Sequence, residues 1–132
     1  MYNMNILCVL VFMILCHIIA DYNLQGWLAS AKQFEWWEKQ DCYNDFYKND
    51  YKMALFMHSL SWSIMIHLPI IVFYNFNINF YILLSIISNC LLHYVIDDAK
   101  ANWKLINLVQ DQILHLIQIL IYWAILCVLC VA

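Results

Sequence analysis

Four long apolar stretches dominate this sequence, and each has the length of a membrane-crossing helix. The hydrocarbon core of a bilayer is spanned by about 20 consecutive, mostly apolar residues in a helix. Lipid offers the backbone no hydrogen-bond partners, so we expect these stretches to cross as helices. With 66% hydrophobic and 11% charged residues, the chain matches neither a soluble nor a disordered protein. We predict an all-α, polytopic membrane protein: a single bundle over residues 1–132 with four transmembrane helices at about 4–21, 53–74, 78–97 and 111–132.

The first apolar stretch is the shortest of the four, and it has some likeness to a signal peptide. It lacks both a basic segment before it and a small-residue cleavage site after it. It also ends in two ionisable residues, His17 and Asp21. We therefore expect it to remain in the mature protein as a helix of the bundle.

The six cysteines do not have the pattern of a disulfide framework. Five of them lie inside apolar stretches, where a thiol behaves as a small buried hydrophobe. Cys127 and Cys130 form a CxxC pair, but no second pair completes a zinc ligand set. We interpret this pair as incidental.

The lysines indicate how the helices are oriented. All of them lie in the two polar segments, from Tyr22 to Lys52 and from Asp97 to Gln110, which four crossings place on one side of the membrane. Lysine near helix ends marks the cytoplasmic side, so we predict that both termini lie outside. The formal charge is -3 and there is no basic patch, so we expect no nucleic-acid partner. The lysines are Lys32, Lys39, Lys48, Lys52, Lys100 and Lys104.

An aromatic-rich part of the first polar segment predicts a helix at the membrane surface. Trp27, Phe34, Trp36 and Trp37 lie here among charged residues. This mixture is typical of helices at the level of the lipid headgroups. We favour a cytoplasmic interfacial helix that anchors the loop. The alternative is a lid or a substrate rail over a site beneath it.

Histidine and aspartate recur as pairs at the cytoplasmic ends of the predicted helices. Ionisable residues within membrane helices are costly, and they mark candidate functional sites. A spacing of four residues places both members of a pair on one helical face, one turn apart. His58 lies just inside the start of its helix, near the depth of the paired histidines. The pairs are His17 with Asp21, His93 with Asp97, and Asp111 with His115.

His67 is the exception among the histidines. It lies about 13 Å deeper than His58 along the same predicted helix, beside Pro69. We interpret it as a hydrogen-bonded interior residue and exclude it from the candidate site.

The clustered residue types suit a divalent metal. Imidazole nitrogen and carboxylate oxygen are ligands for zinc, manganese or iron, and helix bundles commonly build metal sites from inward-facing side chains. The set is large enough for one or two ions, with some carboxylates acting as general base or orienting an imidazole. A single pair at a helix end is more often a hydrogen-bonded cap, so the hypothesis requires all four helices to contribute at one level. The candidate ligands are His17, His58, His93 and His115, with Asp21, Asp97 and Asp111 as further ligands or catalytic groups.

Nearby polar residues are candidates for holding a substrate. Lys32 and Lys100 are the basic residues nearest the cluster, and Lys100 follows Asp97 on the same helical face. Either ammonium group can neutralise that carboxylate or attract an anionic lipid headgroup. The alternative is the ordinary snorkelling of lysine at a membrane boundary. Gln25 and Gln112 complete the predicted substrate-binding set.

Three short motifs resemble the signature of a membrane family. They are HxxAD from His17 to Asp21, HYxxD from His93 to Asp97, and DQxxH from Asp111 to His115. In combination with Lys32 and His58 they resemble the small integral-membrane family of bacteria and phages called domain of unknown function 3307. The resemblance covers nearly the whole chain and implies a bacterial or phage setting in the cytoplasmic (inner) membrane. It implies no activity.

Three classes of function remain open. The first is a metal-dependent hydrolase acting on the headgroup of a lipid or other amphiphile. The chain also has a looser similarity to bacterial inner-membrane proteins described as metal-dependent hydrolases, which agrees with this function. The second is a transporter or sensor of protons or metal ions, although the outer half of the bundle lacks a continuing ionisable path. The third is a noncatalytic phage or host-envelope protein whose polar layer only locks the helices together. We favour the first, and the sequence leaves the oligomeric state open.

Overall fold

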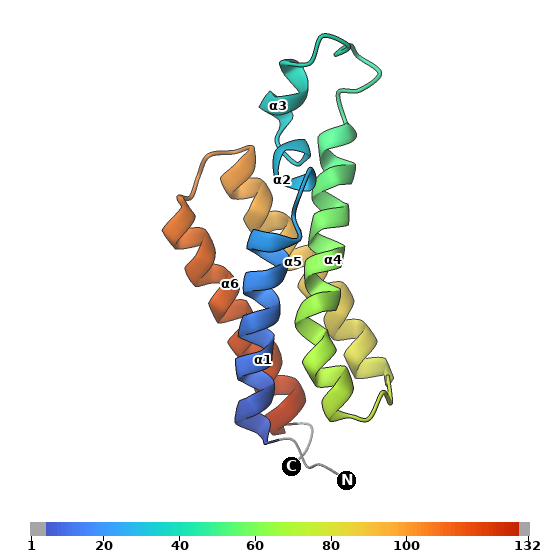
Figure 1. Cartoon of the computed structure of the whole chain (residues 1–132), viewed down its shortest axis with the longest axis vertical. Helices are drawn as coiled ribbons and strands as arrows, with labels where there is room; N and C mark the ends of the chain where they lie inside the picture. Colours follow the sequence, from blue (N-terminus) through green and yellow to red (C-terminus); the bar gives the residue numbers. More distant parts are fainter. Residues whose placement is uncertain (1–4, 130–132) are drawn as a thin grey trace.

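The computed structural model describes residues 5–129, and all regular structure in that part of the chain is helical (Figure 1). The predicted helix start at Met4, the predicted end at Ala132 and the second cysteine of the CxxC pair, Cys130, lie outside the described residues.

Four long helices run alongside one another, and each is long and apolar enough to cross a membrane. The predicted all-α fold with four membrane-spanning helices is therefore confirmed. Figure 1 shows the start of α1, the turn between α4 and α5 and the end of α6 at one end of the bundle. The helices are α1 (Ile6–Ile18), continued by the π-helical η1 (Ile19–Asn23); α4 (Asp50–Phe73); α5 (Phe80–Ala101); and α6 (Leu108–Trp123), continued by the π-helical η2 (Ala124–Leu129).

Asparagine side chains fix where three of these helices begin. Asn5 accepts a hydrogen bond from the Leu7 backbone at the start of α1, and Asn79 does the same for α5. Asn107 forms a reciprocal capping box with Gln110, which starts α6 three residues before the predicted position. The helix starts predicted from hydropathy differ from the observed ones because capping side chains, and not apolar residues, set the first turn.

The segment between η1 and α4 folds back over the other end of the bundle (Figure 1). Gly26 permits this reversal, because its φ of 50° lies in the left-handed region that favours glycine. The predicted single interfacial helix is instead two short helices, α2 (Leu28–Ala31) and α3 (Phe34–Glu38). They are separate because Gln33 between them has an extended backbone. Trp36 and Trp37 of α3 make edge contacts with Trp27.

The outside and the core of the bundle are both largely apolar. Exposed leucine and isoleucine side chains cover the outer faces of the four long helices. Inside, Met13, Ile70 and Ile82 belong to one buried cluster near the end with the α4–α5 turn. The buried lysine and aspartates, Lys32, Asp97 and Asp111, instead gather toward the opposite end, where the candidate site lies.

Candidate metal centre

The four clustered histidines come from four different helices and meet at one level. His17 lies on α1, His58 on α4, His93 on α5 and His115 on α6, and each is at most 2% exposed. The ring centroids of His93 and His115 are 4.3 Å apart, and those of His58 and His93 are 5.3 Å apart. The ring of His17 lies 5.8 Å from that of His115. The structure thus brings the four imidazoles of the predicted site together.

Asp97 is the hub of this layer. Its Oδ2 atom lies 3.2 Å from His58 Nε2 and 2.5 Å from Lys32 Nζ. Its Oδ1 atom lies 3.2 Å from His115 Nε2 and 3.6 Å from His93 Nε2. One buried carboxylate therefore contacts three imidazoles and an ammonium group, which offset the cost of burying its charge.

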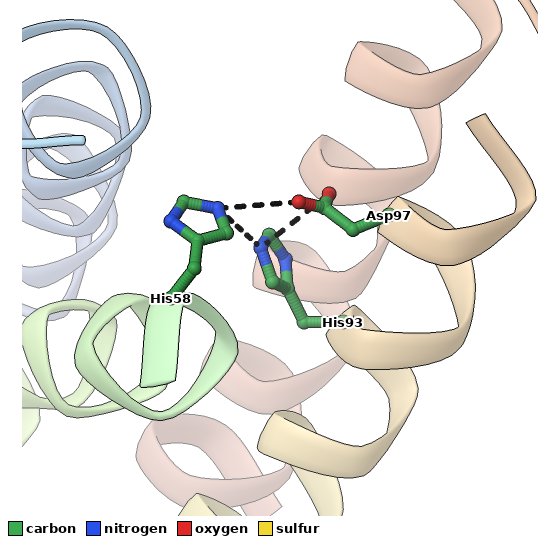
Figure 2. Close-up of side chains that lie close together, drawn as sticks. All are labelled: His58, His93 and Asp97. Atoms are coloured by element: carbon green, nitrogen blue, oxygen red, sulfur yellow. Dashed lines mark hydrogen bonds and ion pairs between the residues drawn. The ribbon is translucent and has the colours of Figure 1, made fainter. Parts of the chain in front are cut away.

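His58, His93 and Asp97 each offer a donor atom around this hub, and these atoms lie within 4.8 Å of one another. The Nε2 atoms of His58 and His93 are 3.3 Å apart, and each lies within 3.6 Å of a carboxylate oxygen of Asp97. Figure 2 shows the three side chains pointing toward a common centre. Donors bound to one zinc ion at 2.0–2.2 Å in tetrahedral geometry lie roughly 3.3–3.6 Å apart. This first cluster could therefore hold a metal once Lys32, which contacts Asp97 Oδ2, withdraws.

A second set of donors adjoins the first. Asp21, Asp111 and His115 each offer a ligand atom, and these atoms lie within 4.8 Å of one another. His115 Nε2 is 3.3 Å from Asp111 Oδ1, and it also contacts Asp97 of the first cluster. His115 therefore lies between the two clusters. Lys100 Nζ contacts the other oxygen of Asp111 at 2.7 Å.

His17 is held in a chain of hydrogen bonds that leads to the second cluster. Trp62 Nε1, which can only donate, lies 3.0 Å from His17 Nδ1. The neutral ring therefore carries its proton on Nε2, which donates to Gln112 Oε1 at 3.1 Å. The Gln112 amide nitrogen in turn donates to Asp21 at 2.9 Å and to Asp111 at 3.0 Å. Both ring nitrogens of His17 are thus engaged, so in this geometry it orients Gln112, and its role as a ligand stays a prediction.

Comparison with known proteins places the whole chain in one family. Residues 9–132 match the profile of a family described as Protein of unknown function (DUF3307). The chain belongs to this family. The family predicted from the sequence motifs is thereby confirmed, and the match includes every residue of both clusters. No curated protein and no solved structure matches the chain, so the comparisons attach no activity to it.

A tryptophan that the sequence analysis missed forms one wall of the centre in this DUF3307 protein. The Trp62 ring stacks on His93 with 4.0 Å between centroids and an interplanar angle of 14°. It also lies 5.4 Å from the ring of His115. Trp62 is four residues after His58 and therefore on the same face of α4, and this spacing is the signal that would have identified it.

Lys32 reaches the centre from the segment that folds over the bundle. It contacts Asp97 although 65 residues separate the two in sequence. Asn102, just after α5, fixes this segment by donating to the Lys32 carbonyl and accepting from the Phe34 amide. Because the Lys32 side chain is only 8% exposed, snorkelling to the membrane boundary is the wrong interpretation for it. Lys100, predicted to lie near Asp97, instead pairs with Asp111.

A polar cavity of about 260 Å³ adjoins both clusters. Asp21 and Asp97 contribute to its wall, so the clusters are accessible from it. All four predicted substrate-binding residues line the cavity, together with Lys104, which the sequence analysis did not select. Those four residues are Lys32, Lys100, Gln25 and Gln112.

His67 lies outside the centre, as predicted from its depth. Its Nδ1 atom is 2.8 Å from the Ser63 carbonyl and its Nε2 atom is 3.0 Å from Ser85 Oγ. The prediction of a hydrogen-bonded interior histidine is therefore confirmed. In contrast, the Nδ1 atoms of His93 and His115 have no hydrogen-bond partner among the described residues.

Proposed function

We propose that this protein binds one or two divalent metal ions at the His/Asp centre and uses them for hydrolysis at the headgroup of a lipid or other amphiphile. The observation that carries the proposal is the 3.2–3.6 Å spacing of donor atoms on His58, His93 and Asp97. A polar layer that only packs does not require the two Nε2 atoms of His58 and His93 and the carboxylate of Asp97 to point toward one position. Zinc, manganese and iron are the metals that this donor set suits.

The two clusters divide the predicted ligands between two ions. His58, His93 and Asp97 would hold the first ion, and His115, with two further carboxylates, would hold the second. His17 would position Gln112 rather than bind metal, since both of its ring nitrogens are engaged. A bound metal would lower the pKa of a coordinated water molecule to near neutrality, about 7 in well-known zinc sites.

The reaction that fits this arrangement is addition of water to a phosphoryl or acyl centre. The water oxygen forms a bond to that centre, and the bond to the leaving oxygen breaks. Asp21 borders the cavity and, when only the first cluster holds an ion, would accept the water proton as general base, returning it to the leaving oxygen. Lys32 and Lys100 would hold an anionic group of the substrate, and Gln25, which donates to Asp21 at 2.6 Å, would orient the base.

The cytoplasmic side of a bacterial inner membrane is the proposed location of the centre. The lysine-bearing segments lie at the same end of the bundle as the centre, which supports this orientation and external termini. Cys42 is exposed in the segment between α3 and α4, so a membrane-impermeant thiol reagent can test the proposal. We expect labelling in inverted membrane vesicles and protection in intact cells. Labelling of Cys42 in intact cells would show that the protein has the opposite orientation.

Elemental analysis of the detergent-purified protein tests the metal itself. We expect stoichiometric zinc, manganese or iron in the natural protein and its loss in His93→Ala. His67→Ala is the matched control, because it removes a buried histidine of the same helical bundle outside the centre and should retain the metal. Hydrolysis is then measured as phosphate or fatty-acid release from lipid vesicles, with and without a chelator.

A structural polar layer is the competing function, and the Lys32–Asp97 ion pair favours it, because a paired carboxylate needs no metal. Natural protein that is metal-free after gentle purification and gains no thermal stability from added zinc, manganese or iron would establish this alternative.

A further inference from the structure

The centre has a second opening besides the polar cavity. A narrow crevice of about 80 Å³ runs between η1 and α2 on one side and α4 on the other. His58, a member of the first cluster, lies at its inner end. Apolar side chains form most of its wall, notably Leu24, Leu28 and Met65.

Gln25 lies between the two openings. It lines both the cavity and the crevice, and its amide nitrogen lies 2.6 Å from Asp21 and 3.3 Å from His58 Nε2. A ligand that filled both spaces would displace the Gln25 amide and would then lie beside Asp21 and His58, one donor group from each cluster.

The two openings differ in chemistry. Three lysines line the cavity together with Asp21 and Asp97. Lys32 and Lys100 are paired with aspartates, whereas Lys104 is half exposed, donates to the Ala101 carbonyl at 2.9 Å and lies 3.6 Å from Glu35. The crevice instead opens on the outer face of the bundle, where Leu24 is 62% exposed and Ser61 is also exposed. On this face α1 and α4 present apolar side chains suited to lipid.

We propose that the substrate is an anionic, phosphate-bearing membrane lipid, with its headgroup in the lysine-lined cavity and the first carbons of one chain in the crevice. The inference rests on the proposed function, since it names the substrate of the same centre. Ammonium groups bind phosphate as point charges, whereas a zwitterionic headgroup brings its own cation into the cavity. The chain leaves through the crevice directly into the bilayer, so the lipid need not be extracted from the membrane.

A photoreactive phosphatidic acid, carrying a diazirine near the carbonyl end of its chain, tests this arrangement in phosphatidylcholine nanodiscs. We expect cross-links at Leu24, Leu28 and Met65 that unlabelled phosphatidic acid suppresses severalfold. Labelling at Leu91, an exposed residue of α5, reports ordinary boundary lipid and should not be suppressed. Millimolar inorganic phosphate distinguishes a lipid site from a site for free phosphate, and suppression by phosphate alone would overturn the assignment to a lipid.

Matched variants test the crevice. Ser61→Phe should block it and reduce the specific cross-links severalfold, whereas Ile64→Phe, an exposed change on the same helix outside the crevice, should leave them unchanged. If Ser61→Phe does not fold, Leu24→Trp obstructs the crevice from the opposite wall. Equal labelling in the blocked and control variants would contradict the proposal.

The metal content of the same samples separates this inference from the proposed function. The cross-linking is run with zinc, manganese or iron(II) in turn and with a chelator, and the bound metal is measured in parallel. Protein that binds none of the three metals but shows the specific cross-links would end the metal proposal and keep the lipid site. Protein that binds one of the metals without the specific cross-links would end the lipid site and keep the metal proposal.

Discussion

The two ends of this bundle are built on different principles. At the end with the α4–α5 turn, buried apolar residues such as Val9, Ile70 and Ile82 fill most of the interior, beside the hydrogen-bonded pair of His67 and Ser85. At the other end, the helices meet through Asp97, Asp111 and their basic partners. Because lipid is as apolar as leucine, helices in a membrane associate through packing and polar contacts rather than through the hydrophobic effect. The apolar end supplies the packing, so the polar end can keep costly groups arranged for a ligand.

Among the proposed variants, Asp97→Asn should have the largest effect at the polar end. The amide cannot replace the hub carboxylate, so we expect stoichiometric metal binding to be lost, as in His93→Gln. The change also leaves the Lys32 ammonium without its counter-charge, which costs about 3–5 kcal/mol for a buried pair. Metal content and thermal unfolding in detergent measure the two effects.

The control for this change lies at the apolar end. Ile82→Val removes one methylene group and should cost about 0.5–1.5 kcal/mol while leaving metal binding intact. Loss of metal in Ile82→Val would show that the two ends are not independent, and full metal content in Asp97→Asn would show that the hub carboxylate is not a ligand.

Lys32→Met should be destabilising mainly in the absence of metal. Removing the ammonium leaves Asp97 buried and unpaired, again at about 3–5 kcal/mol. A bound divalent ion compensates the same carboxylate, so zinc should raise the melting temperature of Lys32→Met more than that of the natural protein. Lys104→Met changes an exposed lysine of the same cavity and should alter stability by only about 0.5 kcal/mol. Equal zinc effects in all three proteins would rule out a metal at Asp97.

Trp62→Phe should have the smallest effect of the three. It keeps an aromatic ring against His93 but removes the hydrogen bond that sets the tautomer of His17. Loss of such outer contacts typically weakens metal affinity about 10–100-fold. Trp123→Phe removes an equivalent indole hydrogen bond, to the Ile6 carbonyl, and should leave the affinity unchanged. Calorimetric titration with zinc measures both, and similar losses in the two variants would point to a general loosening of the bundle.

The sequence predicted the helices well because their signal is local. Apolar length located the four crossings, and a spacing of four residues indicated that His93 and Asp97 share a face. Polar partners distant in sequence were not predictable in this way. Lys100 has the right spacing for Asp97, yet it pairs with Asp111 on the neighbouring helix. The position near Asp97 is occupied by Lys32.

The position of the segment that carries Lys32 over the centre could not be predicted from local sequence patterns for a similar reason. Asn102 ties down the Lys32 segment through contacts that span about 70 residues, and no spacing rule connects such positions. Gly26 redirects the chain before α2, and the extended Gln33 divides the expected interfacial helix just after the buried Lys32. Trp62, in contrast, could have been predicted, because its helical spacing from His58 alone places it at the centre.

The pairing of acidic with basic side chains also bears on how such a protein is assembled. A nascent chain must be inserted and its helices brought together before any ion reaches the interior. During that period Lys32 serves as an internal counter-ion for Asp97, and Lys100 does so for Asp111. If the protein binds metal as proposed, loading would be an exchange, in which two ammonium groups withdraw from the carboxylates as the ion arrives. The rate of loading would be governed by how readily those two side chains swing into the cavity.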